Sequence, residues 1–268
     1  MQGPSSPTRS RVAFERRPKS GGVRLLCHLD AELSARYTSV VARVAPVVEH
    51  ALAPQVLAHR VAVVSRRPPA IVLRDWRRER ACFESERLRI GGLVVRTDVT
   101  DCYGSISVDG VRDGLGRCGA GARGTAACVR VLGELADEGV RGLPVGPVPS
   151  AVLANAVLAG GDAALCGLGV DFVRWVDDWW IGVRSTPHAA EVLGVLEEAV
   201  AAAGLRLNER KTHLGPPDET GWAPSDAEYH RAADAHAVPV LAGANPLLSH
   251  DGGLAAGRWT PRRARGEW

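Results

Sequence analysis

The stretch Val170-Asp-Phe-Val-Arg-Trp-Val-Asp-Asp-Trp-Trp-Ile-Gly-Val183 carries the strongest fold signal in this sequence. Two short runs rich in aromatic and β-branched residues flank the acidic pair Asp177-Asp178, which predicts a β-hairpin with that pair at its tip. Two adjacent carboxylates repel each other unless a cation lies beside them. Taken alone, such a pair is more often a plain solvated turn, so the interpretation depends on the rest of the chain.

Composition predicts a globular protein of one large or two small domains. The chain has 268 residues, is 46% hydrophobic and carries a net charge of only +3, which is weak support for a polyanionic partner. Its six cysteines form no CxxC pair and no metal-ligand spacing. There is no signal-peptide pattern and no apolar run near the ~20 residues that span a bilayer. We therefore expect reduced thiols, a cytoplasmic location and no membrane partner.

Strand and helix signals alternate between residues 93 and 212. An apolar strand over 93–99 carries Asp98 at its end, and two helical segments and a glycine- and proline-rich loop follow it. The hairpin, a helix from Thr186, and a strand and turn over 205–212 complete the order. This order predicts an α+β fold with a split βαβ, ferredoxin-like antiparallel sheet and helices on one face. Neighbouring strands lie about 4.8 Å apart, so Asp98 should meet Asp177 and Asp178 at one edge.

Three converging aspartates would form an all-oxygen site, which suits Mg²⁺ or Mn²⁺ and, without His or Cys, not zinc. Two such ions serve phosphoryl transfer, in which position and charge supply most of the catalysis. A cation near the leaving pyrophosphate would assist. Lys211 is a candidate, because arginine supplies 31 of the 33 basic residues and the only lysines are Lys19 and Lys211.

Four segments in order resemble the palm motifs of reverse transcriptases. They are Asp98-Val-Thr-Asp-Cys-Tyr-Gly-Ser-Ile106, Gly142-Leu-Pro-Val-Gly-Pro-Val-Pro-Ser150 with Leu153-Ala-Asn155, Arg174-Trp-Val-Asp-Asp178, and Gly204-Leu-Arg-Leu-Asn-Glu-Arg-Lys-Thr212. The resemblance covers about 93–214, less than half of the chain.

The resemblance implies a role for each matching position. Metal-site positions fall at Asp98, Val99, Asp177 and Asp178, and Lys211 joins the aspartates as a catalytic group that faces the triphosphate. Tyr103 falls where the family has a steric gate against a ribose 2′-hydroxyl; without the motif it is equally a core tyrosine. Nucleotide contacts are expected from Tyr103, Leu143, Pro144, Val145, Gly146, Arg66 and Arg74.

The same resemblance implies a domain plan. We expect a flexible basic arm over 1–22, a fingers-like region over 23–92, and a palm over 93–214 with part of the fingers inserted at about 116–142. Residues 215–268 would be a short extension or thumb remnant. Val145 replaces the glutamine usual in intron-encoded and retroviral members, so the chain is more similar to prokaryotic stand-alone enzymes of the abortive-infection and unknown-group type, many tied to phage defence.

The expected activity is RNA-directed DNA polymerisation with an RNA template, a DNA or RNA primer and dNTPs. A non-coding RNA or a partner protein is left open, as is template-independent or protein-primed DNA synthesis. Tyr103 argues against an RNA-dependent RNA polymerase. The alternative from another class is a catalytically retired, polymerase-like scaffold that binds nucleic acid or protein.

Overall fold

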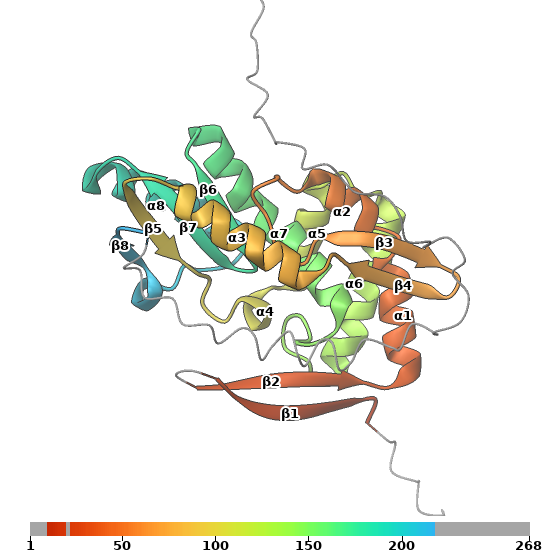
Figure 1. Ribbon diagram of the computed structural model, residues 1–268. Helices are drawn as coiled ribbons and strands as arrows, with labels where there is room; N and C mark the ends of the chain where they lie inside the picture. The colour runs from red at the N-terminus through yellow and green to blue at the C-terminus, as the bar shows by residue number, and fades with distance from the viewer. Residues whose placement is uncertain (1–9, 20–21, 218–268) are drawn as a thin grey trace, which may run out of the picture. The chain divides into compact units, whose positions relative to one another are not determined.

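The computed structural model describes residues 10–19 and 22–217 (Figure 1). Its strands are β1 Val12–Lys19, β2 Gly22–Leu29, β3 Val61–Arg66, β4 Pro69–Leu73, β5 Leu93–Thr97, β6 Phe172–Trp175, β7 Asp178–Val183 and β8 His213–Gly215. Its helices are α1 Ala31–Val41, α2 Ala45–Ala51, α3 Trp76–Arg89, α4 Cys102–Ser105, α5 Val108–Arg117, α6 Ala122–Asp137, α7 Val148–Leu168, α8 Thr186–Ala201 and the 3-10 helix η1 Glu209–Lys211.

The central sheet has four strands in the order β6-β7-β5-β8, and all its neighbouring pairs are antiparallel. Strands β5 and β6 therefore run parallel with β7 between them, and β7 and β8 run parallel with β5 between them. These are two interlocked split βαβ units, with α4–α7 and α8 as the connections. The structure confirms the predicted α+β fold, which is compatible with a polymerase palm.

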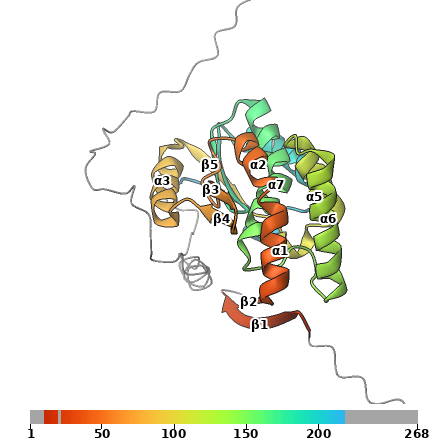
Figure 2. The ribbon, with the colours of Figure 1, turned by 90° about the vertical axis from the view of Figure 1, so that its right-hand side faces the viewer.

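Helices cover both faces of this sheet. Trp179 and Ile181 point into the core formed with α7 and α8, whereas Val94, Val173 and Trp180 pack with Phe83 of α3 on the opposite face. Figure 2 shows α3 on one side of β5 and α7 on the other. The prediction of helices on one face holds for the palm helices; α3 comes from the preceding segment and covers the second face.

Helix α7 runs through the larger of the two hydrophobic clusters. Its buried residues include Leu153, Val157, Leu158 and Leu165. The expectation that no apolar run approaches bilayer length needs correction here, because within the described residues α7 is the one helix long and apolar enough to cross a membrane by length and composition. That test is weak evidence, because 61% of the apolar window is buried inside the structure, as in the core helix of a globular domain.

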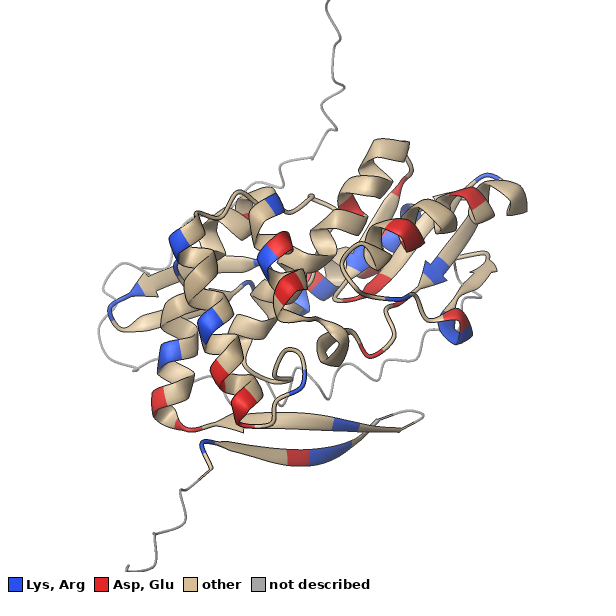
Figure 3. Ribbon diagram, turned by 180° about the vertical axis from the view of Figure 1, so that it is seen from behind, with Lys and Arg blue, Asp and Glu red and all other residues tan. Residues whose placement is uncertain are grey.

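The N-terminal prediction needs correction. Residues 12–19 are not part of an arm: they form β1, which pairs with β2 from Val12 opposite Leu29 to Lys19 opposite Gly22. Val12 and Cys27 are buried in the core, and the Glu15 carboxylate binds both Arg17 and His28. Burial of Val12 and these ion pairs therefore stabilise the arginine-rich strand. Figure 3 shows acidic and basic positions interspersed along the hairpin. The rest of the predicted arm, residues 1–9 and 20–21, lies outside the described residues, as does the C-terminal extension from 218 onward.

The segment 205–212, predicted as a strand and a turn, forms the turn but little of the strand. Only Leu207 forms a bridge, to Val99, then η1 supplies the turn, and β8 starts after it at His213. The 3-10 turn arises because the Asn208 and Glu209 carbonyls accept from the Lys211 and Thr212 amides. This turn matters for the site, because it carries Lys211.

Candidate active site

The β6–β7 hairpin carries the acidic pair as predicted, but its tip is Val176-Asp177. Trp175 pairs with Asp178, so the turn has two residues and Asp178 already belongs to β7. Such tight turns need a positive φ at the first central residue, which favours glycine or asparagine. Here Val176 adopts φ 57°, a strained conformation for a β-branched residue. Strain of this kind gathers at functional sites and needs support from the surrounding structure.

Asp98 follows the end of β5 and lies against the Lys211 segment. The backbone amide of Asn208 donates to the Asp98 carbonyl oxygen at 2.8 Å, and Val99 bridges to Leu207. Lys211 Nζ donates to Asp98 Oδ2, whereas the buried Asp98 Oδ1 has no hydrogen-bond partner within the described residues. The first and fourth motifs therefore meet at one carboxylate.

Asp177 lies within electrostatic reach of the same carboxylate. Burial, followed by the negative charges of Asp178 and Asp98, raises the pKa of Asp177 from 3.8 to about 7. Burial works against the charged form of Lys211, but the hydrogen bond to Asp98 and the charges of all three aspartates outweigh it and raise the Lys211 pKa. The site therefore holds more negative charge than its one lysine neutralises.

Asp178 lies on the face of the sheet that α3 covers, next to Arg96 and Trp180. Arg96 of β5 approaches its Oδ1 with both Nε and Nη2 at 3.3 Å and also lies 5.5 Å from the Trp180 ring. Arg96 was not among the predicted site residues, although a lone arginine in the apolar strand 93–97 was a visible signal. This contact gives Asp178 a part in supporting the hairpin, in addition to the metal-site position that the resemblance implies for it.

A divalent cation fits part of this arrangement. Within residues 10–19 and 22–217, no three His, Cys, Asp or Glu side chains are grouped for a metal ion. Lys211 engages Asp98, and Arg96 engages Asp178. Amino-acid cations thus take the places next to two of the predicted ligands. The bare Asp98 Oδ1 and the weakly neutralised Asp177 are hard oxygen donors, which suit Mg²⁺ or Mn²⁺. Asp98 and Asp177 are the residues that could hold such an ion.

The first and second motifs are joined through backbone contacts. The Leu143 amide donates to the Tyr103 carbonyl oxygen at 2.8 Å, and a Cβ on Gly142 would lie 2.2 Å from that oxygen. The side chains of Leu143 and Pro144 are buried, so of the predicted nucleotide loop only Val145 and Gly146 are partly exposed. The β1–β2 hairpin braces this loop, because the Cys27 amide donates to the Val145 carbonyl oxygen at 2.8 Å.

Helix α4 lies beside the carboxylates as well. Burial, followed by the negative charges of Asp177 and Asp98, raises the pKa of the Cys102 thiol well above its usual value. Tyr103, the next residue, is half-buried. The structure therefore brings the predicted gate segment to the same edge as Asp98 and Asp177.

The two predicted arginines are placed differently. Arg74 donates to Glu49 at 2.9 Å and lies 4.0 Å from Glu79, so its charge is neutralised within the N-terminal region. Arg66 is exposed at the end of β3. These contacts give neither arginine a link to the 143–146 loop.

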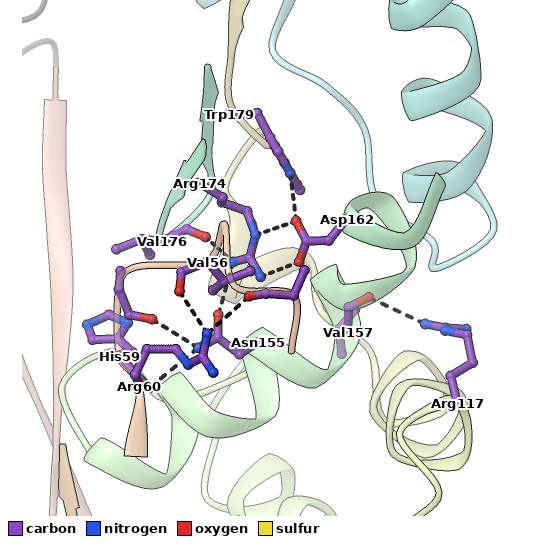
Figure 4. A network of polar contacts seen from close by, with 12 residues as sticks. Val56, His59, Arg60, Arg117, Asn155, Val157, Asp162, Arg174, Val176 and Trp179 are labelled. Atoms are coloured by element: carbon purple, nitrogen blue, oxygen red, sulfur yellow. Dashed lines mark hydrogen bonds and ion pairs between the residues drawn. The ribbon is translucent and has the colours of Figure 1, made fainter. Parts of the chain in front are cut away.

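A buried polar network lies behind the hairpin (Figure 4). Arg174 of β6 is fully buried and binds Asp162 of α7 with two nitrogens, at 2.8 and 2.7 Å. Asn155 accepts from Arg174 at 2.9 Å, and Trp179 Nε1 donates to Asp162 at 2.9 Å. Asp162 was missed by the sequence interpretation, although a lone acid in the apolar helix 148–168 could have been matched to a lone arginine in the strand 172–175.

Comparisons with known proteins add little to this geometry. No protein-family model and no curated protein sequence matches the chain. Among solved structures, telomerase from Candida albicans in complex with a TWJ fragment of telomeric RNA aligns with a TM-score of 0.45 and 14% identity, over 79% of this chain. The chain spans 42% of that telomerase chain. A likeness at this level assigns no activity.

Proposed function

We propose that this chain is an RNA-directed DNA polymerase of the stand-alone prokaryotic type, which adds dNTPs to a 3′-hydroxyl by two-metal phosphoryl transfer. One observation carries the proposal. Four motifs that are far apart in the sequence meet at one edge of a split βαβ sheet, around Asp98 and Asp177. Asn208 and Lys211 bind Asp98, Leu143 binds the backbone of Tyr103, and Asp177 is electrostatically coupled to Asp98.

The proposal gives each group a task. Bound Mg²⁺ or Mn²⁺ would supply activation of the 3′-hydroxyl and neutralisation of the triphosphate. Asp98 and Asp177 would hold the ions, and Asp98 would then release Lys211. The freed ammonium would face the triphosphate, whose negative charge would then favour its protonated form in place of the Asp98 carboxylate. Tyr103 would exclude a ribose 2′-hydroxyl.

The bare Asp98 oxygen also bears on the retired-scaffold alternative. A buried carboxylate oxygen without a partner is destabilising, and so is a charged carboxylate whose pKa is raised by burial and then by neighbouring negative charges. A cation would relieve both. This favours a working metal site over a scaffold that has lost its chemistry, and a role in phage defence remains part of the proposal by analogy alone.

The test is incorporation of labelled dNTPs by the purified full chain with Mg²⁺ or Mn²⁺, on a primed RNA template and without template. Asp177→Ala should lower incorporation by about 100-fold or more, since it removes charge stabilisation that acts in the transition state. Asp171→Ala is the matched control, because Asp171 is an exposed acid just before the same hairpin.

Each outcome has a meaning. Template-dependent product that Asp177→Ala loses and Asp171→Ala retains supports the reverse transcriptase. Template-free product with the same dependence points to untemplated or protein-primed synthesis. Product that survives Asp177→Ala refutes the metal-site assignment, and no product from folded protein in any arm favours the scaffold.

A further inference from the structure

Arg174 is the most completely enclosed charge in the described part of the chain. Its exposed fraction is 0%, and three of its nitrogens donate to four acceptors. Two nitrogens bind the two oxygens of Asp162, and Nη1 binds both Asn155 Oδ1 and the Val176 carbonyl oxygen. A buried ion pair is retained only where its geometry and hydrogen bonds are nearly complete, so a structural or functional reason should exist for it.

The Val176 carbonyl shows what the network reaches. Val176 is the first residue of the two-residue turn, it adopts φ 57°, and it directly precedes Asp177. Valine disfavours this left-handed conformation, so the turn needs support from outside its own sequence. The hydrogen bond from Arg174 to the Val176 carbonyl is such support. Asp162 and Asn155 hold the guanidinium in the orientation that makes it.

The network also joins the hairpin to the N-terminal region. Asn155 Nδ2 donates to the carbonyl oxygens of Ala58 and His59 at 3.1 and 3.4 Å. The Arg174 backbone exchanges hydrogen bonds with Gln55 and Leu57, so the segment 55–57 lies along the free edge of β6. Helix α7, the 55–59 segment and the turn before Asp177 therefore share one set of hydrogen bonds.

We propose that Asp162 is a positioning residue for Asp177, acting through Arg174 to hold Val176 in the left-handed conformation. Asp162 touches no reacting group; it sets where the Asp177 carboxylate points. This inference deepens the proposed polymerase function and rests on it for its kinetic readout, whereas its metal-binding readout does not.

The test combines loss of the network with relief of the strain it supports. Asp162→Asn keeps the size of the side chain and removes its charge. We expect at least a 10-fold loss of dNTP incorporation and at least a 5-fold higher Mn²⁺ concentration at half-maximal rate. Calorimetric titration of Mn²⁺ into the protein without nucleotide should show the same loss of affinity. Adding Val176→Gly should recover most of both losses, because glycine adopts a positive φ without support.

Val176→Ala is the matched control, since alanine also removes the branched side chain but still disfavours a positive φ. It should give much less rescue than Val176→Gly. Equal rescue by Val176→Ala, or unchanged Mn²⁺ affinity in a folded Asp162→Asn variant, would overturn the inference. If circular dichroism shows that Asp162→Asn does not fold, Asn155→Ala replaces it, because that variant keeps the ion pair between Arg174 and Asp162. The Mn²⁺ affinity of Asn155→Ala should fall 2-fold or more and should recover when Val176→Gly is added. An unchanged Mn²⁺ affinity in Asn155→Ala would overturn the inference.

The two proposals can fail separately. Mn²⁺ binding that depends on Asp162 and is rescued by Val176→Gly, in a chain that incorporates no nucleotide, would sustain the positioning role and refute the polymerase. Incorporation that is indifferent to Asp162 would do the reverse. A wild-type chain that neither binds Mn²⁺ nor incorporates dNTPs would refute both.

Discussion

Asp177 makes stability depend on pH in a direction opposite to that of most surface carboxylates. Its pKa is raised from 3.8 to about 7, so the folded state binds this proton more tightly than the unfolded state. The resulting stabilisation is complete below the lower value and is lost as pH rises to the upper one. Without divalent ions, the melting temperature should therefore fall as the pH rises from about 4 to about 7, and less so in Asp177→Asn.

Mg²⁺ should reverse this loss. At about pH 8, where Asp177 is charged, adding Mg²⁺ should raise the melting temperature of the wild type more than that of Asp177→Asn, because a ligand that binds only the folded state stabilises it. Thermal unfolding followed by circular dichroism, with EDTA or Mg²⁺, measures both effects. Equal slopes against pH in the two proteins would show that Asp177 does not titrate in this range.

Tyr103 permits a selectivity prediction. Its side chain is half-buried, and its backbone holds the Leu143 amide, so the tyrosine ring can be removed without breaking that bond. Tyr103→Ala should lower the preference for dNTPs over rNTPs by about 10-fold or more, since a steric filter discriminates by exclusion. Incorporation assays with both nucleotide types measure the ratio. An unchanged ratio would assign Tyr103 to packing alone.

At the scale of single residues, the sequence predicted the charged groups that lie at the ends of strands. Asp98, Asp177 and Lys211 were found because carboxylates and a rare lysine stand out at strand ends, and the structure brings them together. The pairing of Arg96 with Asp178 and of Arg174 with Asp162 was not predicted. Each pair joins two segments that are distant in the sequence, and the local pattern of one segment does not indicate which residue of the other it will contact.

Gly142 lies where the second motif packs directly against the backbone of α4, with no room for a side chain. Its φ is 68°, and an added Cβ would lie 2.2 Å from the Tyr103 carbonyl oxygen and 2.8 Å from Gly104. Gly142→Ala should separate the second motif from α4. We expect a loss of about 3 kcal/mol or more in the free energy of unfolding, which exceeds the strain of a positive φ alone.

Gly139→Ala separates the two causes. Gly139 has φ 87° and nothing within 4 Å of an added Cβ, so this variant reports the backbone strain without the clash. Its stability loss in chemical denaturation should be roughly 1 kcal/mol. If the two variants lost equal stability, the contact between Gly142 and Tyr103 would not be the reason for glycine at that position.

Elements were predictable where local pattern and tertiary role agree. The β6–β7 hairpin was found because its strands are aromatic and β-branched. Local signals also agree with the structure at helix starts, where the side chains of Asp30, Asp75 and Ser107 accept from first-turn amides. The β1 strand was missed because arginine and proline in that segment mimic an unstructured tail. Its strand conformation depends on the pairing with β2 and on burial of Val12, both of which are long-range effects.

At the scale of the whole described chain, the order of strands and helices was enough to predict the split βαβ sheet. The covering of its second face was not. Helix α3 is rich in arginine and glutamate and reads as a surface helix, yet Phe83 is buried against Trp175 and Trp180, with Arg80 and Arg87 over the indole rings. A single aromatic anchor with cation–π contacts leaves no amphipathic period in the sequence.

The predicted fingers-like and palm regions share one core, and this determines how the protein should unfold. Leu33 and Tyr37 of α1 are fully buried in the same cluster as Leu153 of α7, and Tyr37 hydrogen-bonds Ser150 at 3.1 Å. Leu33→Ala should therefore destabilise the palm as well. We expect a loss of about 2–5 kcal/mol in the free energy of unfolding.

Two probes can test this shared unfolding. Far-ultraviolet circular dichroism follows all helices. In a background where Phe replaces Trp76, Trp222, Trp259 and Trp268, tryptophan fluorescence reports on the central sheet, because the remaining Trp175, Trp179 and Trp180 are buried in it. In Leu33→Ala both probes should shift to the same lower denaturant midpoint, since a continuous core unfolds cooperatively. Leu88→Ala, at a residue that is 58% exposed, should shift neither. A circular dichroism transition that moves while the tryptophan transition stays would mean that the two regions unfold separately.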